Sequence, residues 1–320
     1  TKIEPGNGKY AILCNEKGGI LNDPVLLRIA EDEFWFSLSD TDLMLWLQGV
    51  NISKKYDVTI DEIDVCPVQI QGPLSENLMA KLAGEELRDI PFYGLMETKI
   101  EGVDTVISQT GFTGEKGYEI YVRDAHENAE IVWNAVLEAG EEFGLMVIAP
   151  AHHRRIAAGI LSWGQDMDFE TSPFQVNLYY QVPRNKEADY IGKNELERQR
   201  AIIDGGEFPF KMRMVGLTFG GKQITDYAPD FWLIADTEGN DMGYITSPWW
   251  SPELDTNIAL GWVPWTSSEI GTKLQVRLPD EYSESSGVPV EGEIVDVPFR
   301  ESVNPNKREV QKAKGLDYAD

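Results

Sequence analysis

The sequence is poor in cysteine, and this shortage excludes proteins that depend on disulfides. Only two cysteines, Cys14 and Cys66, occur among the 320 residues, and they form no CxxC pair. Two such residues are too few for a disulfide framework, so we expect reduced, buried thiols rather than a bridge or a metal site. Redox chemistry therefore has no support in the sequence.

Long apolar runs are also missing. No run approaches the roughly 20 residues that a helix needs to cross a bilayer, and the opening residues TKIEP do not resemble a signal peptide. Hydrophobic residues still make up 42% of the chain, which is enough to build large cores, and the length predicts two or three domains. We expect a globular protein of the cytoplasm.

Positive charge is scarce as well. Lysine and arginine number 28 against 54 aspartates and glutamates, which gives a net charge of −26. Phosphate contacts require clustered lysine and arginine, so nucleic acid is excluded as a partner and anionic membranes are disfavoured. The motifs GxGxxG, GxxxxGK(S/T) and GxSxG are absent too, so nothing indicates a nucleotide phosphate-binding loop or a hydrolase nucleophile.

The order of the remaining patterns predicts an α+β fold. Strands and helices alternate up to a charged helix over residues 193–203, which ends at Gly205-Gly206, and six short strands separated by turn residues follow it. Such a run of strands is typical of a β-rich barrel or sandwich. We therefore expect three domains, at residues 1–66, 67–204 and 205–320.

A helix is expected in the second half of the first of these domains, over residues 40–50. Leucine and tryptophan side chains supply its apolar face, and Asp40 or Thr41 is expected to cap its start. A second helix, over residues 150–161, begins with a proline. The first helix follows the segment that contains Asp23, and the second precedes the segment that contains Trp163.

The most informative segment is a glycine-punctuated hairpin, which reads ISQTGFTGEKGYEIYV from residue 107 to residue 122. Its glycines permit the turn, and the alternation after Gly117 predicts a half-buried strand with Glu119 inside it. A carboxylate there can accept hydrogen bonds from adjacent N–H donors, as on a pterin edge. An ordinary hairpin with Glu119 facing solvent would explain the same residues.

Further segments follow one another in order along nearly the whole chain. They read GGILNDPVLL from residue 18, QGP from residue 71, SWGQDMDFETSPF from residue 162, DYIGK from residue 189 and ITSPWWSP from residue 245. Together with the hairpin they resemble the glycine cleavage system T-protein (aminomethyltransferase) family. The form NDPVLLR is similar to the dimethylsulfoniopropionate demethylase-like branch, because T-proteins usually carry two aspartates where Asn22 and Asp23 stand.

This resemblance implies a three-domain, ring-like arrangement and tetrahydrofolate as the cofactor. It also implies that the chain begins late, so that the first strands and helices of the family fold, and part of the folate-binding domain at residues 67–204, are expected to be missing. On that expectation this exact chain would be an inactive fragment.

The resemblance implies that Asp23 is the catalytic residue, because the family's catalytic carboxylate is the second of the pair that follows Gly-Gly-x-x. A carboxylate beside the reacting nitrogen of a folate can steer protonation or stabilise positive charge. Asn22, which replaces an acid of the T-proteins, is expected to contact the substrate. The alternative is that Asp23, between Asn22 and Pro24, holds the turn.

The family's folate-binding residues carry over to the hairpin. Glu119 becomes the pterin-recognition acid, with Phe112 and Tyr118 as further folate contacts. The family also has an arginine where this chain has Ala151, so contacts to the folate tail are expected to differ, or Arg154 or Arg155 to substitute. Arg155 is our candidate.

Trp163 is the candidate for binding the donor, since its ring can face a sulfonium or quaternary ammonium cation. A packed loop, in which Asp166 and Asp168 accept hydrogen bonds from backbone donors, is the competing interpretation. The adjacent His152 and His153 would point about 100° apart on a helix and make poor joint ligands, so we assign no metal.

The resemblance favours a tetrahydrofolate-dependent one-carbon transferase. The expected reaction removes a methyl group from a small sulfonium or onium donor, such as dimethylsulfoniopropionate, and gives 5-methyltetrahydrofolate. One alternative is the aminomethyltransferase reaction, which would require a lipoyl carrier protein as partner. Another is a non-catalytic, folate-binding regulatory protein.

Overall fold

The computed structural model describes residues 3–38, 42–149 and 152–299. Its helices and strands are mixed, as predicted, and six strands near the end of the chain close into a barrel. The chain forms two compact units, residues 1–11 with 22–150 and residues 12–21 with 151–320. The predicted boundaries after residues 66 and 204 fall inside these units, so the division into three domains stays a prediction.

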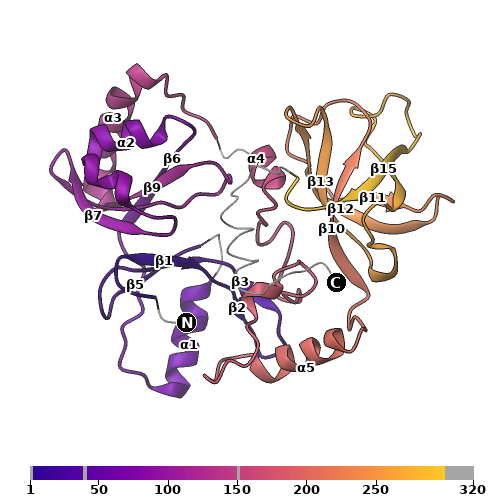
Figure 1. The fold of residues 1–320 in the computed structure, drawn as a ribbon, viewed down its shortest axis with the longest axis horizontal. Coiled ribbons are helices and arrows are strands. Elements are labelled where there is room, and N and C mark those ends of the chain that lie inside the picture. Colours follow the sequence, from indigo (N-terminus) through magenta and orange to yellow (C-terminus); the bar gives the residue numbers. More distant parts are fainter. Residues whose placement is uncertain (1–2, 39–41, 150–151, 300–320) are drawn as a thin grey trace. The chain divides into compact units, whose positions relative to one another are not determined.

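A four-stranded antiparallel sheet forms the centre of the first unit. Its order is β6 (Val65–Gln71), β9 (Gly117–Arg123), β8 (Val103–Ser108) and β7 (Leu95–Ile100). Figure 1 shows α2 (Ser75–Ala83) and α3 (Ala125–Gly140) on one side of this sheet. The apolar side chains of β9 on that side, Tyr118, Ile120 and Val122, join a core with residues of both helices. The alternation predicted for this strand is thus confirmed.

The opposite face of this sheet packs against a smaller sheet of three strands. These are β1 (Asn7–Tyr10), β4 (Val25–Arg28) and β5 (Phe34–Ser37), with β4 in the middle. Leu27 and Trp35 form a second core with Val106 and Tyr121 of the larger sheet. Because successive strand residues point to opposite faces, Tyr121 and Glu119 share this face while Tyr118 does not.

Helix α1 (Leu43–Lys54) follows β5 and matches the helix predicted over residues 40–50. The capping residues proposed for it, Asp40 and Thr41, lie outside the described residues. Asp42 directly precedes the helix and makes no capping hydrogen bond through its side chain.

In the second unit a tight glycine turn joins β2 (Leu13–Cys14) to β3 (Ile20–Asn22). Gly18 has a φ of +78°, which side-chain-bearing residues rarely adopt, and a Cβ on Gly19 would lie 1.9 Å from the Phe169 carbonyl oxygen. The Asn15 amide donates to that same oxygen at 2.8 Å. The paired glycines are therefore required where this turn packs on the segment around residue 169.

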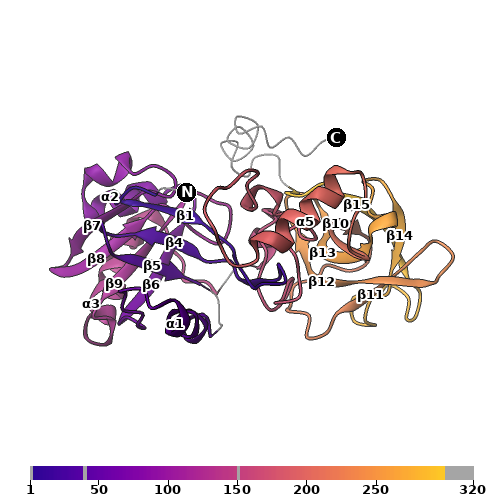
Figure 2. The ribbon, with the colours of Figure 1, turned by 90° about the horizontal axis from the view of Figure 1, so that it is seen from below.

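The second unit ends in the barrel, drawn in orange and yellow in Figure 2. Its order is β10 (Met212–Phe219), β13 (Thr256–Pro264), β12 (Asp241–Ser251), β11 (Trp232–Ala235), β14 (Lys273–Val276) and β15 (Val290–Val295), and β15 pairs with β10. Leu217, Ile234 and Val276 are among the side chains that fill it. The predicted β-rich barrel is confirmed.

Helices α4 (His152–Ala157) and α5 (Lys193–Asp204) precede the barrel. Short 3-10 helices complete the structure at η1 (Glu85–Asp89), η2 (Glu141–Phe143), η3 (Tyr179–Gln181) and η4 (Trp265–Ser267). Within the described residues, no helix combines the length and apolar character that spanning a bilayer requires.

Two sequence predictions need correction here. Helix α4 covers only the first half of the helix predicted over residues 150–161, because Gly159 adopts a φ of +67° just after it ends. Cys14 is buried as predicted, but Cys66 is exposed, since β6 is an edge strand of its sheet.

Candidate functional site

Asp23 lies in the short turn between β3 and β4 and is half-buried. Its Oδ2 accepts a hydrogen bond of 2.9 Å from the Tyr10 hydroxyl at the end of β1. The pairing of Tyr10 with Val25 in the adjacent strands brings the phenol to the carboxylate. The sheet therefore orients this carboxylate, which suits both the catalytic and the turn-holding interpretation.

Asn22 is fully buried. Its side-chain oxygen accepts the Asp23 backbone N–H at 2.9 Å. An amide can make this contact without carrying charge into a buried position, where an ionised acid would be costly. Asn22 thus shapes the turn, and its burial leaves no surface for the substrate contact predicted for it, so we leave Asn22 out of the proposed donor site.

Glu119 lies near the end of β9, half-buried on the face shared with Tyr121. Its Oε2 accepts hydrogen bonds from the Thr110 hydroxyl and, at 3.1 Å, from the Tyr121 hydroxyl. Oε1 accepts no hydrogen bond from any residue that the structure describes. One carboxylate oxygen is thus held by the protein, and the other has no hydrogen-bond donor among the described residues.

The surroundings of Glu119 oppose its ionisation. Burial raises the pKa of Glu119 above that of an ordinary glutamate, and the hydrogen bonds from Thr110 and Tyr121 partly offset this. The negative charge of Glu119 also affects the pKa values of the neighbouring tyrosines. Burial and the nearby Glu119 raise the pKa of Tyr93 to about 12, and the same two causes raise the pKa of Tyr121. Both phenols therefore stay protonated and can donate.

The two aromatic residues predicted beside Glu119 have different positions. Phe112 lies in the hairpin loop with 39% of its surface exposed, so its ring is available to a ligand. Tyr118 is fully buried in the core formed with α2 and α3, on the face opposite Glu119. Tyr118 therefore supports the strand, and we leave it out of the proposed folate site.

Arg155 is the largest fully buried side chain of the second unit, at 1% exposure. It forms an ion pair of 2.7 Å with Asp166 and also donates to the Ile160 carbonyl at 3.2 Å and the Ser247 hydroxyl at 2.8 Å. These contacts give Arg155 a structural role, so we also leave it out of the folate site. Ala151, where the family's arginine was expected, lies outside the described residues.

Asp166 connects three parts of the second unit. Besides Arg155 on α4, its carboxylate accepts the Ser162 backbone N–H at 2.9 Å and the Thr246 and Ser247 hydroxyls of β12 at 2.7 and 2.5 Å. All of these partners donate hydrogen bonds to the carboxylate. A buried carboxylate needs such donors, because they offset the cost of removing its charge from water. The packed-loop interpretation is confirmed for Asp166.

Trp163 lies in the same loop and is half-buried. Its indole Nε1 donates to the Ile20 carbonyl of β3 at 2.9 Å. The hydrogen bond fixes the edge of the indole and leaves part of the ring accessible. This position is compatible with a cation contact and also with simple packing.

The histidine at the start of α4 is engaged with aromatic residues. The His152 ring stacks on Trp249, with centroids 5.8 Å apart, and lies 5.5 Å from the Tyr227 ring. Burial and then the positive charge of Arg155 lower the pKa of His152. Among the described residues, no group of three or more His, Cys, Asp or Glu side chains is arranged to hold a metal ion.

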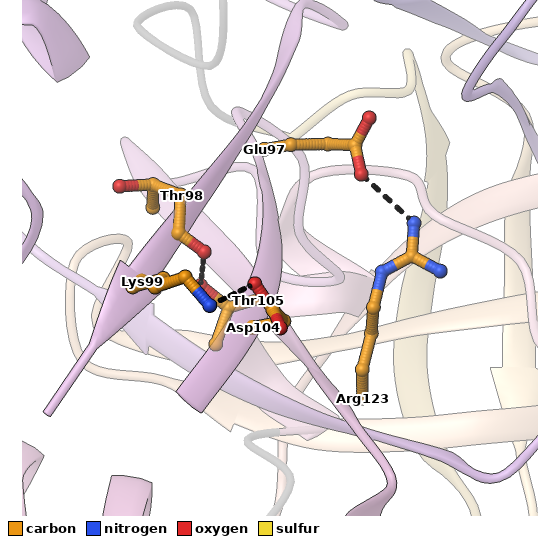
Figure 3. A pocket seen from close by; sticks show the side chains of 6 residues that line it. All are labelled: Glu97, Thr98, Lys99, Asp104, Thr105 and Arg123. Atoms are coloured by element: carbon orange, nitrogen blue, oxygen red, sulfur yellow. Dashed lines mark hydrogen bonds and ion pairs between the residues drawn. The ribbon is translucent and has the colours of Figure 1, made fainter. Parts of the chain in front are cut away.

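A polar hollow on the first unit lies along β7, β8 and β9 (Figure 3). Its charged groups pair with one another, Arg123 with Glu97 at 2.9 Å and Lys99 with Asp104 at 2.7 Å. Thr105 donates to the Thr98 carbonyl at 3.1 Å. Because these groups satisfy each other, the hollow offers little to a ligand, and the predicted site residues lie elsewhere.

Sequence reasoning missed the hydroxyl groups that orient the two carboxylates. Tyr121 could have been found, because it stands two residues after Glu119 on the same strand face. Thr110 and Tyr10 gave no such signal, since each reaches its carboxylate through a loop or a neighbouring strand.

Comparison with known proteins agrees with this architecture. Residues 1–186 match the family model described as the GCVT N-terminal domain, and residues 213–299 match the glycine cleavage T-protein C-terminal barrel domain. The chain is 34% identical over 281 residues to the dimethylsulfoniopropionate demethylase DmdA of Ruegeria pomeroyi, covering 85% of this chain and 71% of that protein. It is 28% identical over 284 residues to an aminomethyltransferase of a Geobacillus species, covering 87% and 74%.

A solved structure shares the fold. The crystal structure of the glycine cleavage system aminomethyltransferase T from Bartonella henselae superimposes with a TM-score of 0.71 at 23% identity, covering 93% of this chain and 77% of that one. The two matched domains, together spanning most of the sequence, show that the chain belongs to the glycine cleavage T-protein family.

Proposed function

We propose that the protein is a tetrahydrofolate-dependent one-carbon transferase that demethylates a small sulfonium or onium donor. The observation that carries the proposal is the Glu119 carboxylate, in which the protein donates hydrogen bonds to Oε2 and no described residue donates to Oε1. A carboxylate oxygen with free lone pairs fits the N–H donors of a pterin edge. The exposed ring of Phe112 adds an aromatic surface in the adjoining loop.

When bound, tetrahydrofolate supplies a nucleophilic nitrogen that accepts the one-carbon group. The role of the protein is then to hold the two reactants and to balance charge. Asp23, oriented by Tyr10, provides a negative charge that stabilises a positively charged donor or a developing charge on the acceptor nitrogen. Trp163 offers part of its ring to the cationic donor.

Demethylation of a cation does not require protonation of the leaving group, because the donor atom leaves as a neutral sulfide or amine. The bond between the methyl carbon and the sulfur or nitrogen of the donor would break, and the donor atom would keep the electron pair and become neutral. The acceptor nitrogen would form the new bond to the methyl carbon and release its proton. Alignment of the donor with the acceptor therefore supplies most of the rate enhancement. Similarity to a dimethylsulfoniopropionate demethylase supports this donor class.

Aminomethyl transfer from a lipoyl carrier protein is the second candidate. Several relatives at about the same identity are aminomethyltransferases, including one of Clostridium botulinum at 31% over 278 residues. The buried, neutral Asn22 argues against it, because T-proteins usually carry an acid at this position.

Calorimetric titration with tetrahydrofolate tests the folate site. Glu119→Ala should weaken binding by about 10-fold to 150-fold, because a hydrogen bond to a charged group contributes about 1.5 to 3 kcal/mol. Glu97→Ala is the matched control, since Glu97 lies on β7 of the same sheet and its side chain is exposed. Equal affinity of the Glu119→Ala variant and the unaltered protein would reject the folate site.

A further inference from the structure

Thr110 occupies a buried position between two polar side chains. Its hydroxyl oxygen lies 2.5 Å from the Ser108 hydroxyl oxygen, and both residues are at most 3% exposed. Thr110 also donates its hydroxyl hydrogen to Oε2 of Glu119. Because a hydroxyl has one hydrogen, this leaves Ser108 to donate to Thr110. The hydrogen bonds therefore run in one direction, from Ser108 through Thr110 to Glu119.

The same carboxylate oxygen receives a second hydrogen bond, from Tyr121 at 3.1 Å. A carboxylate oxygen has two lone-pair sites, so Oε2 is saturated by Thr110 and Tyr121. Oε1 keeps both of its sites for a ligand, because no described residue donates to it. Rotation of the carboxylate would break both hydrogen bonds, so the two hydroxyls also fix which oxygen is presented.

We propose that Thr110 is a positioning residue for ligand recognition: its hydroxyl, supported by Ser108, holds Oε2 of Glu119 so that Oε1 alone accepts the N–H groups of the pterin. This rests on the proposed function, which assigns Glu119 to the pterin. Thr110 itself need not touch the ligand.

The charge state of Glu119 depends on the same contact. The hydrogen bond from Thr110 lowers the pKa of Glu119 against the effect of burial. Tyr93 and Tyr121 are the titratable groups coupled to this carboxylate, and both are neutral phenols at physiological pH. The cation that β9 carries on the same face, Arg123, pairs with Glu97 instead. On the cross-strand positions, Gln69 and Ser108 carry no charge.

The variants that test this role are Thr110→Val, which removes the hydroxyl at nearly constant size, and Thr110→Ser, which keeps it. Calorimetric titration with tetrahydrofolate is carried out from about pH 5 to about pH 9. Binding requires ionised Glu119, so affinity is full above its pKa and falls as the pH drops through it. Without the Thr110 hydrogen bond that pKa rises further, so the loss of affinity should begin at a higher pH.

For Thr110→Val we expect the affinity for tetrahydrofolate near neutral pH to fall about tenfold and the acidic limb of the pH profile to move to higher pH. For Thr110→Ser we expect the affinity and the pH profile of the unaltered protein. A loss that is equal at every pH, or one that serine does not restore, would show a merely structural role and overturn the proposal. Thr110→Ala replaces valine if the unfolding temperature shows that valine disturbs the fold.

Glu119→Gln separates this proposal from the one on which it rests. If Glu119→Gln binds tetrahydrofolate as well as the unaltered protein, the folate site itself is wrong. If Glu119→Gln binds weakly while Thr110→Val binds normally, only the role of Thr110 is wrong. In the Glu119→Gln background, Thr110→Val should leave the pH profile unchanged, because the group that titrates is gone.

Discussion

The Tyr10 hydroxyl donates a hydrogen bond of 2.9 Å to Oδ2 of Asp23, thirteen residues further along the chain. The antiparallel pairing of β1 with β4 creates this contact, since Tyr10 lies opposite Val25. The orientation of Asp23 is thus built into the sheet rather than into the turn alone. Removing the charge of Asp23 while keeping its size is therefore a clean test of its role.

Asp23→Asn should lower single-turnover methyl transfer by about 100-fold or more, the range typical for a group that stabilises charge or moves a proton in the transition state. Folate affinity should change little, because the amide keeps the size and the Tyr10 contact. Rapid-quench measurements report the rate. Tyr10→Phe, which removes one hydrogen bond and no charge, should have a smaller effect. An unaltered rate in Asp23→Asn would remove Asp23 from catalysis.

Trp163→Leu should raise the Michaelis constant for the donor by about 2-fold to 30-fold, which corresponds to a cation–π contact of about 0.5 to 2 kcal/mol. Folate affinity should stay the same. Trp265→Leu is the control, because Trp265 is also a partly exposed tryptophan but is not one of the predicted site residues. It lies in η4, directly after β13. If Trp163→Leu leaves the Michaelis constant unchanged, Trp163 only packs the loop.

Arg155→Met should destabilise the protein by about 3 to 5 kcal/mol, because it leaves the buried Asp166 carboxylate without its cation. Chemical denaturation measures this loss. The exposed pair of Arg184 with Asp204 provides a comparison, and Arg184→Met should cost only about 0 to 1 kcal/mol. Similar losses in the two variants would contradict the structural role of Arg155. So would a variant that keeps its stability but loses folate binding.

The two cysteines should differ sharply toward a thiol reagent. Cys66 is exposed, whereas Cys14 is buried and burial raises its pKa to about 12. Since the thiolate is the reactive form, Cys14 should react only after unfolding at any pH well below 12. Colorimetric titration should therefore count one thiol in the native protein and two in denaturant. Rapid modification of both thiols in the native protein would be inconsistent with the burial of Cys14.

Local periodicity explains which parts of the fold could be predicted from the sequence. The hairpin around Glu119 and the six barrel strands have alternating apolar residues between turn signals, and all of them form. Strand β7 was not predicted, because its charged residues Glu97 and Lys99 hide the alternation. It forms because β8 pairs with it along its whole length.

The site was predictable only where sequence position determines the face of a strand. The position of Glu119 in a half-buried strand followed from alternation. Alternation also places Tyr118 on the opposite face, where it is fully buried in the core with α2 and α3. The pairing of Arg155 with Asp166 joins a helix to a loop eleven residues later, and the Ser247 contact crosses 92 residues. Such contacts depend on tertiary packing, so they could not be predicted from local patterns in the sequence.

The identity of the products tests the central claim most directly. The protein is incubated with tetrahydrofolate and either dimethylsulfoniopropionate or an aminomethyl-lipoyl carrier protein, and the folate products are identified by mass spectrometry. We predict 5-methyltetrahydrofolate from the sulfonium donor, with a neutral sulfide as the second product, and no product from the carrier. Formation of 5,10-methylenetetrahydrofolate with ammonia from the carrier would contradict this account and establish aminomethyl transfer. Absence of any product from either donor, in protein that binds tetrahydrofolate, would contradict it in favour of a binding protein.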